Sequence, residues 1–386
     1  MSDLLPYPRF SDHEFGRRYR GVRESMAEAD LAALLVYGAR GPQAVSVQYL
    51  SNYLVTQRAH LLFPVDGEPV LFVQLWNHLP LARKLSVVAD TRWGGPNSAA
   101  AVAGELAGRG LGRSRIGLVG DLPFQDERRL RELLPDAELV DFTVRFLAHR
   151  LVKSEEEIDW LRRGAELSDR SAEALERELR PGLREDELPL IVESAYLGAG
   201  GTNEIHFMAT TPMAAPDACV PAQFPSNRVI EAGDVLITEL SAQYWGYPGQ
   251  ILRPYAVQME PTPLYRRLYD VALECFTRVA AVLRPGATAQ QVVDATRIIE
   301  EADFSIYDDL LHGYGGGYLP PVLRTPETAH GPVPEFTFEE NMTVVIQPNV
   351  ITKDERAGVQ VGELVRITAD GVESLHRYPM QFTVCG

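Results

Sequence analysis

The first part of the chain alternates between helix-like and strand-like stretches of apolar residues. Over residues 12–29, apolar side chains recur every three or four positions, which is the spacing of one face of an amphipathic helix. Short apolar runs follow, and two of them flank Asp66-Gly67, a dipeptide typical of a hairpin turn. The strand-like runs lie at residues 31–38, 60–65, 69–74, 115–120 and 138–142. Strands that alternate with helical stretches predict a small α/β domain over residues 1–150.

Strong helix signals mark the start of a second domain. Ser154 and Glu157 have the spacing of a capping box, which predicts a long amphipathic helix that ends near Arg180. Further helices are predicted at residues 185–198, 262–284 and 288–302, with strand-rich segments after each helix pair. A helix pair followed by strands therefore occurs twice. This order predicts an α+β domain over residues 151–386, in which helices wrap a sheet.

Composition and charge exclude several classes of partner. The formal net charge of −16 disfavours nucleic acids, because their phosphates favour basic surfaces. No apolar run approaches the roughly 20 residues of a membrane span, and the acidic, proline-interrupted start MSDLLPYPRF does not resemble a secretory signal. Three widely spaced cysteines fit a reducing compartment better than a disulfide framework: Cys219, Cys275 and Cys385. We therefore expect a cytoplasmic protein without nucleic-acid or membrane partners.

Four segments of the second domain carry a family resemblance. They are EAGDVLITELSAQYWGYPGQILRPY (231–255), RPGATAQQVVD (284–294), HGYGGGYLPP (312–321), and MTVVIQPNVIT with GVQVGELVRIT (within 342–368). In order and spacing they resemble the pita-bread superfamily of methionine aminopeptidase, aminopeptidase P, prolidase and creatinase. The first domain and the junction from Val152 to Glu155 resemble the longer, creatinase- and prolidase-type members. The resemblance covers essentially the whole chain, and it implies a smaller α/β domain followed by a C-terminal pita-bread domain.

The metallopeptidases of this superfamily hold two metal ions with five ligands, in the order Asp, Asp, His, Glu and Glu. The first two ligands lie eleven residues apart, and the second lies three residues before an arginine. Glu239, Gln250 and Arg253 have this spacing here. The five ligand positions fall on Glu239, Gln250, His312, Gln347, and Gly362, or Glu363 if the last strand slips by one residue. Two buried divalent ions need several anionic or nitrogen ligands, and this set keeps too few. We therefore predict no metal cofactor.

The first functional hypothesis is a metal-independent hydrolase, or a related lyase, that acts on a small polar compound with a C–N bond. The family precedent is creatinase, which resembles the peptidases in fold but hydrolyses a small guanidino substrate with side-chain acid and base groups. Here His312 and Glu239 would be the acid/base pair. Creatine itself fits poorly, because Ala222 and Gln347 replace a His and a Glu that creatinase-like enzymes use. The candidate substrate-binding residues are Gln250, Gln347, Arg253, Tyr314, Tyr318, His206 and Arg58.

Several of these candidates also have ordinary structural explanations. His206 lies sixteen residues before Ala222 and is a candidate replacement for the lost histidine, but we favour an ordinary half-buried histidine. Tyr314 and Tyr318 flank three glycines, and packing alone explains many aromatic residues in such hairpins. Another family histidine falls on Leu319.

Two further hypotheses stay open. Loss of the metal-binding carboxylates also fits a small-molecule or peptide-binding protein without activity. Glutamines at two ligand positions speak against simple decay, because a decayed site would fill with apolar residues. The second alternative, an Xaa-Pro aminopeptidase or dipeptidase, matches the fold but would lack the metal that activates water.

The resemblance also implies a homodimer. In creatinase-like dimers, a loop of the first domain reaches the partner's pocket and supplies an arginine and an aromatic residue. The corresponding stretch here is residues 49–63, which makes Arg58 a candidate for binding a substrate carboxylate, with Tyr53 and His60 nearby. A solvated loop arginine is the alternative explanation.

Overall fold

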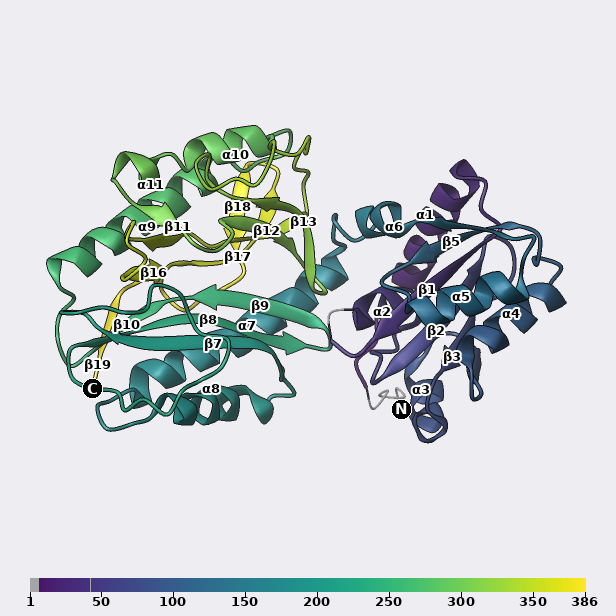
Figure 1. Ribbon diagram of the computed structural model, residues 1–386, viewed down its shortest axis with the longest axis horizontal. Helices are drawn as coiled ribbons and strands as arrows, with labels where there is room; N and C mark the ends of the chain where they lie inside the picture. Colours follow the sequence, from purple (N-terminus) through teal and green to yellow (C-terminus); the bar gives the residue numbers. More distant parts are fainter. Residues whose placement is uncertain (1–6, 42) are drawn as a thin grey trace. The chain divides into compact units, whose positions relative to one another are not determined.

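The structure is a computed structural model that describes residues 7–41 and 43–386. The chain forms two compact units, one ending at Arg150 and the other beginning at Leu151 (Figure 1). The expectation that the start of the chain forms no secretory signal rests in part on residues 1–6, which lie outside the described residues. No helix in the described ranges is long and apolar enough to cross a membrane. The three cysteines are buried and free of disulfides.

The first unit is a mixed sheet with helices on both faces. Its strands run in the order β4-β3-β2-β1-β5-β6, and β1 pairs antiparallel with β2 but parallel with β5. The strands are β1 (Ala33–Ala39), β2 (Arg58–Pro64), β3 (Val70–Val73), β4 (Asp90–Trp93), β5 (Arg115–Val119) and β6 (Glu138–Asp141). The helices are α1 (Asp12–Glu28), α2 (Ala44–Ser51), α3 (Leu79–Leu85), α4 (Ser98–Gly108), α5 (Phe124–Leu133) and α6 (Thr143–Ala148).

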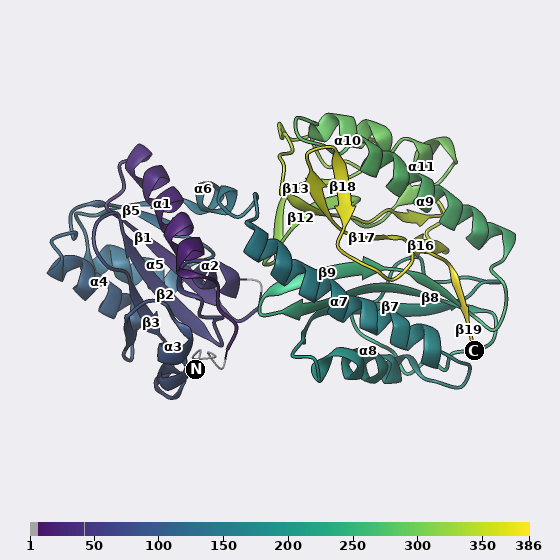
Figure 2. The same cartoon turned by 180° about the vertical axis from the view of Figure 1, so that it is seen from behind.

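Apolar side chains from the strands and helices form the core of this unit. Leu35 and Leu62 of the sheet pack with Val102 and Leu106 of α4 and Leu130 of α5. Figure 1 shows α4 and α5 over one face of the sheet, and Figure 2 shows α1 over the other. The helix predicted at residues 12–29 and the five predicted strands are therefore present, and α2 is a helix that the sequence reasoning did not identify.

The second unit is built on a ten-stranded sheet. The order along its main path is β13-β12-β14-β17-β9-β8-β10-β19, with β18 beside β17 and β7 beside β8. The strands are β7 (Thr202–Pro212), β8 (Asp234–Tyr244), β9 (Tyr247–Leu252), β10 (Pro254–Val257), β12 (Leu311–Tyr314), β13 (Tyr318–Leu323), β14 (Thr343–Ile346), β17 (Gly362–Thr368), β18 (Gly371–Ser374) and β19 (Thr383–Cys385). A small separate sheet holds β11 (Ser305–Ile306), β15 (Asn349–Ile351) and β16 (Gly358–Gln360).

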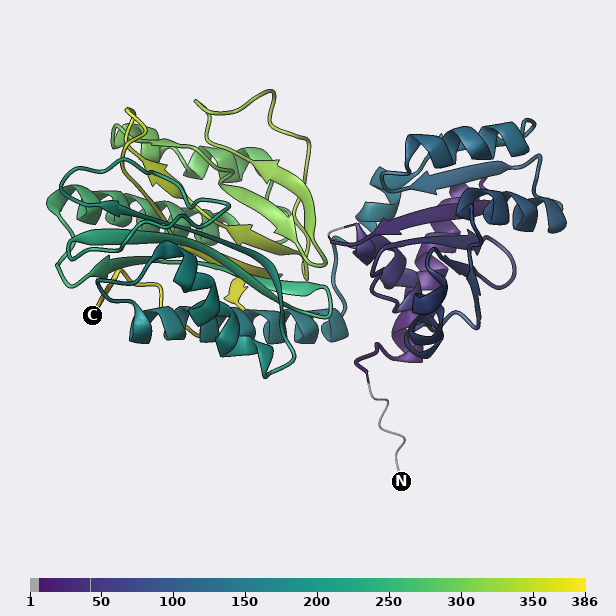
Figure 3. The same cartoon turned by 60° about the horizontal axis from the view of Figure 1, so that its bottom comes forward.

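Two groups of helices pack on the large sheet. The first is α7 (Glu155–Glu178) with α8 (Leu188–Leu197), which shares a core with β8 and β9. The second is α9 (Pro263–Val282), α10 (Ala289–Ala295) and α11 (Ile298–Glu301), which share a core with β12, β14 and β17. The predicted helix at 288–302 is thus divided into α10 and α11. Figure 3 shows the light-green β12–β13 hairpin at the edge of this sheet.

The capping box at Ser154 and Glu157 is present, and it starts α7 as predicted. Two glycines let this helix lie directly against β9. A Cβ on Gly164 would lie 2.4 Å from the carbonyl oxygen of Tyr247, and one on Gly249 would lie 2.2 Å from the backbone of Ala165. Real Cβ atoms do not approach backbone so closely, so both positions need glycine. This contact fixes β9, which carries Gln250.

Candidate functional site

The candidate site lies on the face of the large sheet that points away from the helix-packed cores. In an antiparallel pair, residues directly opposite each other point to the same face. Leu240 of β8 lies opposite Ile251 of β9, and both belong to the core with α7 and α8. The alternate residues of these strands therefore point to the other face. Among them are Glu239, Ser241 and Gln250.

The neighbouring strands add a histidine and a second glutamine to this face. Leu311 lies opposite Leu323, and both belong to the core with α9 and α10. His312 follows Leu311 and lies opposite Val345 of β14, so both point the other way. Gln347, two residues beyond Val345, comes directly after β14. Four candidates from the sequence thus share one face: Glu239, Gln250, His312 and Gln347.

A buried chain of side-chain hydrogen bonds joins three of these residues. The Nε2 of Gln250 donates to Oε1 of Glu239 at 2.9 Å and to Oε1 of Gln347 at 2.7 Å. The Nε2 of Gln347 in turn donates to the backbone oxygen of Asp309 at 3.2 Å. Gln250 and Gln347 are each 1% exposed, so these bonds form away from bulk water. A carboxamide therefore occupies the centre of the site and holds a carboxylate on one side.

Two further residues belong to this network, although the sequence reasoning did not identify them. The Nε2 of Gln360 donates to Oδ2 of Asp308 at 3.1 Å and reaches Oε2 of Glu239 at 3.4 Å. Gln360 ends β16 of the small sheet, so its contact with β8 joins segments far apart in the sequence. The acidic pair Asp308-Asp309, shortly before His312, was the available signal for the carboxylate.

Two buried amide oxygens of this network, Oε1 of Gln250 and Oε1 of Gln360, have no hydrogen-bond partner within the described residues. His312 and Ser241, by contrast, interact with the side chains of Gln347 and Tyr314. An unsatisfied buried polar group costs about 1–3 kcal/mol, so native interiors rarely keep such groups without water or a ligand to satisfy them. The two free oxygens therefore indicate a site for polar molecules rather than a sealed core.

The His312 ring is held in one tautomer. Its Nδ1 lies 3.0 Å from the backbone oxygen of Gly313, which only accepts, so Nδ1 carries the hydrogen and Nε2 is an acceptor. The ring stacks on Tyr318, with centroids 3.7 Å apart and planes 17° apart, and the edge of Tyr314 lies against it. Burial lowers the pKa of His312 to about 4, so the imidazole is neutral at pH 7.

The carboxyl groups of the site have raised pKa values. Burial, together with the nearby charge of Asp308, raises the pKa of Glu239 to about 8. Burial also raises the pKa of Asp308, although the hydrogen bond that its side chain accepts from the backbone of Asp309 opposes that shift. At neutral pH Glu239 is therefore protonated and His312 is neutral, and both lie on the same face of the sheet. These are the states that an acid and a base need before reaction.

Tyr314 and Tyr318 differ in exposure. Tyr314 is buried beside Ser241, and burial raises the pKa of its phenol. Tyr318 is half exposed, and its hydroxyl donates to Oδ2 of Asp309 at 3.1 Å. The stacking of Tyr318 on His312 thus forms the boundary between the buried network and the surface. Leu319, which follows it, is a buried core residue.

Arg253 is not a substrate clamp. Its Nη2 donates to Oε2 of Glu363 at 2.6 Å and to the oxygen of Tyr378 at 3.1 Å, and Nη1 donates to the oxygen of Gly362 at 2.6 Å. The side chain is 1% exposed. The register explains this, because Glu363 lies opposite Ile251 and points to the helix-packed face, as Arg253 does. The expectation that Arg253 binds a carboxylate of the substrate is corrected to a structural role.

The same register settles the last ligand position. Gly362 lies opposite Leu252, on the face of Gln250, so it and not Glu363 takes the position of the final family glutamate. A Cβ on Gly362 would lie 2.0 Å from the oxygen of Ile346 and 2.8 Å from Cα of Gln347. No side chain fits there, because the backbone before Gln347 fills the space.

His206 lies outside the site. It is opposite Leu240 in the β7–β8 pair, so it points to the helix-packed face. Its Nε2 lies 2.8 Å from the hydroxyl of Tyr196 on α8, and burial lowers its pKa to about 4. This position agrees with the favoured explanation, an ordinary half-buried histidine, and gives no support to a role in place of the histidine lost at Ala222. The backbone oxygen of Ala222 accepts from Met208 of β7.

Two family models match this chain. The creatinase/prolidase N-terminal domain matches residues 18–152, and metallopeptidase family M24 matches residues 159–369, which is more than half of the chain. The chain belongs to metallopeptidase family M24. The Xaa-Pro dipeptidase of Pyrococcus furiosus is 26% identical over 263 residues, which cover 67% of this chain and 73% of that protein. The creatinase of Bacillus sp. is 22% identical over 393 residues, which cover 96% and 92%.

Solved structures of M24 proteins have the same fold. An X-Pro aminopeptidase from Thermotoga maritima is similar with a TM-score of 0.81 at 19% identity, covering 95% of this chain and 99% of that one. An Xaa-Pro dipeptidase from Bacillus anthracis is similar with a TM-score of 0.80 at 22% identity, covering 96% and 99%. The predicted architecture of a first α/β domain and a pita-bread domain is therefore confirmed.

The M24 metal positions of this chain do not fit two metal ions. Glu239 is the one carboxylate among them, because Gln250 and Gln347 are amides and Gly362 has no side chain. The amide nitrogen of Gln250 points at the carboxylate of Glu239, where a metal ligand would present an oxygen to an ion. Within the described residues, no group of three His, Cys, Asp or Glu side chains has the arrangement of a metal site.

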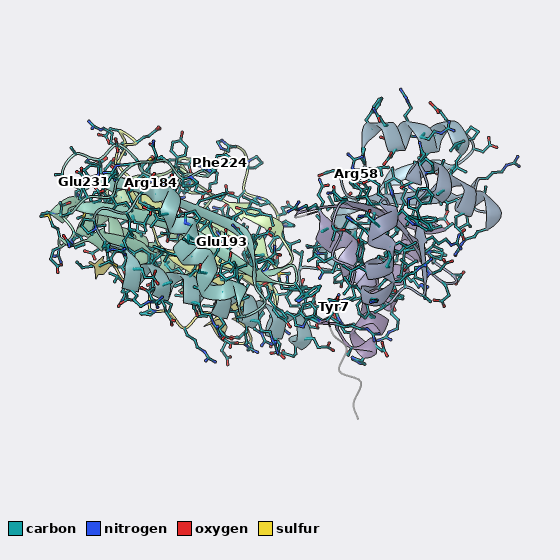
Figure 4. The ribbon with its side chains drawn as sticks, turned by 90° about the horizontal axis from the view of Figure 1, so that it is seen from below. Tyr7, Arg58, Arg184, Glu193, Phe224 and Glu231 are labelled. Atoms are coloured by element: carbon teal, nitrogen blue, oxygen red, sulfur yellow. The ribbon has the colours of Figure 1, made fainter. Side chains whose placement is uncertain are left out.

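Arg58 lies in the first unit, at the start of β2, with an exposed side chain (Figure 4). Most of the stretch at residues 49–63 belongs to α2 and β2. Tyr53 and His60 are buried in that unit, where His60 lies 3.4 Å from Asp126. The role of Arg58 at a partner's site stays a prediction.

Proposed function

We propose that this protein breaks a C–N bond of a small polar compound by side-chain acid/base chemistry, as a hydrolase or related lyase that needs no metal. The observation that carries the proposal is the chain Glu239–Gln250–Gln347, which replaces metal ligands with a closed set of side-chain hydrogen bonds. The family of the chain supports hydrolysis in general.

His312 and Glu239 can supply both proton transfers of the reaction. A water molecule adds to the carbon of the C–N bond while Nε2 of His312 takes one of its protons. Glu239 gives its proton to the leaving nitrogen, so that a C–O bond forms as the C–N bond breaks. A second water then carries the proton from His312 back to Glu239. The amide of Gln250 binds Oε1 of Glu239 and the amide of Gln360 binds Oε2, so the carboxyl group is kept in place.

The test is an activity screen on metal-free protein. Chelator-treated protein, with its metal content measured by mass spectrometry, is offered amide, guanidino and Xaa-Pro dipeptide substrates. We expect turnover that chelator does not reduce and that His312→Ala lowers at least a hundredfold. His13→Ala, at an exposed position of α1, serves as the matched control. Near-stoichiometric Mn, Zn or Co in active protein would refute the proposal.

A binding protein without activity is the second candidate. The burial of Gln250 and Gln347 favours it, because the two amides bind each other and neighbouring groups of the chain. Binding of a compound without turnover over days would establish this alternative. The names of relatives such as Xaa-Pro dipeptidase favour a third candidate, a metallopeptidase. Turnover of Xaa-Pro dipeptides that appears only with added Mn²⁺ would establish that one.

We also propose that the protein acts in the cytoplasm as a homodimer, in which Arg58 reaches the partner's site. Exposure of Arg58 supports this, since its side chain is available to a second copy. Light scattering should give twice the mass of the chain. A mixture of Arg58→Ala and His312→Ala chains should recover part of the activity in mixed dimers, whereas a monomer would recover none.

A further inference from the structure

A cavity of about 240 Å³ lies at the edge of the large sheet, beside strand β13. Its walls come from Val293 of α10, from residues 322–324 around the end of β13 and from the loop at residues 329–334, with Asp309 among them. The side chain of His330, in this loop, is exposed to solvent. A cavity of about 150 Å³ is enough to hold a benzene ring. The cavity beside β13 therefore has room for an apolar group of ring size.

Most of the residues that line this cavity are apolar. Val293 and Leu323 belong to the core that the sheet shares with α9 and α10, whereas Val322 is partly exposed to solvent. The loop adds Pro332 and Pro334, which have no backbone N–H to offer a ligand. An apolar group that enters the cavity exchanges water for these side chains, and this transfer is favourable.

The two charged residues of the cavity wall, Arg324 and Asp309, are bound to each other and to their neighbours. The Nη1 of Arg324 donates to Oδ1 of Asp309 at 3.3 Å. Its Nε and Nη2 donate to the backbone oxygens of Thr328 at 3.0 Å and Tyr307 at 2.9 Å. The other carboxylate oxygen of Asp309 accepts from the hydroxyl of Tyr318 at 3.1 Å. A charged group of a ligand would lose its hydration here and find both charges of the wall already paired.

Two residues of the cavity wall also border the candidate site. Val322 lies directly opposite His312 in the β12–β13 pair, so both side chains point to the same face of the sheet. The Cβ atoms of such cross-strand neighbours are about 4.5–5.5 Å apart. Asp309 makes the second connection, because its backbone oxygen accepts from Nε2 of Gln347 at 3.2 Å. A compound of modest length can therefore reach from His312 into the cavity.

The acid/base pair next to the cavity carries no charge at neutral pH. Burial raises the pKa of Glu239 to about 8 and lowers the pKa of His312 to about 4, so the first is protonated and the second is neutral. The free oxygens of Gln250 and Gln360 accept hydrogen bonds from N–H groups. An uncharged amide supplies such N–H groups, and it costs far less to bury than an ion.

From these features we infer that the substrate is an uncharged amide whose apolar part, a ring or branched chain of about five to eight carbons, lies in the cavity beside Val322. The amide group lies at the network, where the oxygens of Gln250 and Gln360 accept its N–H groups. Free dipeptides, zwitterions and organic cations bring charges that neither the cavity nor the acid/base pair neutralises. The inference rests on the proposed function, because it names the substrate class of the same site.

The binding test compares three matched probes by calorimetry on metal-free protein, with the weaker probes measured by competition. Cyclohexanecarboxamide is the expected ligand. Acetamide has the same amide without the ring, and cyclohexanecarboxylate has the same ring with a negative charge. We expect the ring amide to bind at least tenfold more tightly than either of the others. Equal binding of acetamide, or equal binding of the carboxylate, would overturn the inference.

Variants of Val322 locate the binding. Val322→Trp fills the cavity and should weaken the binding of cyclohexanecarboxamide at least tenfold. Val384→Trp is the matched control, because Val384 is 41% exposed against 44% for Val322 and lies on β19, at the opposite edge of the same sheet. This control should bind the ring amide as the native protein does.

A milder substitution covers the case in which the tryptophan variant does not fold, which thermal unfolding establishes. Val322→Thr keeps the size of the side chain but places a hydroxyl in the cavity wall, and it should weaken the binding of the ring amide about threefold. Unchanged affinity in a folded Val322→Trp, or in Val322→Thr if the first variant is unfolded, would place the ligand elsewhere and refute the inference.

The inference and the proposed function fail in different ways. If cyclohexanecarboxamide binds as expected but metal-free protein hydrolyses no amide, the ligand class stands and the catalytic proposal falls. If metal-free protein hydrolyses acetamide and cyclohexanecarboxamide with equal kcat/KM, the catalytic proposal stands and the ligand class falls.

Discussion

Gly362 lies so close to Gln347 that a Cβ on the glycine would be 2.8 Å from the Cα of the glutamine. From the sequence alone, a glycine at a ligand position indicates only that a metal-binding side chain is missing. In the structure, the space for the missing side chain has been taken by the backbone that carries another residue of the site. The glycine at position 362 and the path of the backbone at Gln347 therefore depend on each other.

A side chain at position 362 should disrupt the site. Gly362→Ala should lower the free energy of unfolding by about 1–3 kcal/mol, because the new Cβ overlaps the backbone at Ile346 and Gln347. Urea unfolding measures the change. Gly331→Ala is the matched control, because a Cβ there meets nothing within 4 Å. In addition, Gly362→Glu should gain no Mn²⁺ binding in calorimetry, and tight binding would contradict the described packing.

The buried pair Arg253–Glu363 should matter for stability. Arg253→Met leaves the Glu363 carboxylate buried without its partner, which typically costs about 3–5 kcal/mol. Arg253→Met with Glu363→Gln should recover part of that loss in urea unfolding. The exposed pair Arg266–Glu260 offers the comparison, and Arg266→Met should change stability by less than about 1 kcal/mol. If the double variant were no more stable than Arg253→Met, the pairing would not be the cause.

Activity should be highest between two pKa values. Below about pH 4, His312 becomes protonated and no longer takes a proton from water. Above about pH 8, Glu239 loses the proton that the leaving nitrogen needs. A profile of kcat/KM against pH should therefore fall at both ends. Glu239→Gln should be slow and should lose the alkaline fall. An unchanged alkaline limb in that variant would assign the limb to another group.

Stability should also depend on Glu239. Burial raises its folded-state pKa to about 8 from an ordinary value of 4.5, so the folded state binds more protons between these values. The contribution of Glu239 to stability is complete below pH 4.5 and is lost as the pH rises through 8. Between pH 5 and 9, the melting temperature should fall more in the native protein than in Glu239→Gln. Equal falls would show that the buried carboxyl does not titrate in this range.

His206 provides a negative test. Its side chain faces α8 rather than the site, so His206→Phe should leave kcat/KM within about twofold of the native value. A large loss of activity, with the melting temperature unchanged, would contradict the assignment of its side chain to the helix-packed face.

The spacing of residues along the sequence was enough to identify the site residues that lie on one hairpin. Glu239 and Gln250 face the same way because β8 and β9 pair as neighbours through a short turn. The contributions of Gln360 and Asp308 were not predictable in the same way. They depend on how the small sheet lies against the large one, which no local pattern encodes.

The wrong role for Arg253 and the disfavoured role for His206 have one explanation. In a strand, a shift of one residue reverses the face of a side chain. Arg253 lies three residues after Gln250, and therefore on the opposite face, and His206 has the parity of Leu240. A short distance in sequence from a site residue predicts that a residue of the same strand lies near the site. Whether its side chain points into the site depends on whether the two are an even or an odd number of residues apart.

The stacking of Tyr318 on His312 also gives the molecule a spectroscopic label. A proton held over an aromatic ring is shielded by the ring current, so the imidazole resonances of His312 should lie upfield of those of the exposed His13. A compound that displaces the half-exposed Tyr318 ring from His312 would remove this shielding. The His312 signal would then shift, and the occupancy of the site could be followed in solution without any reaction.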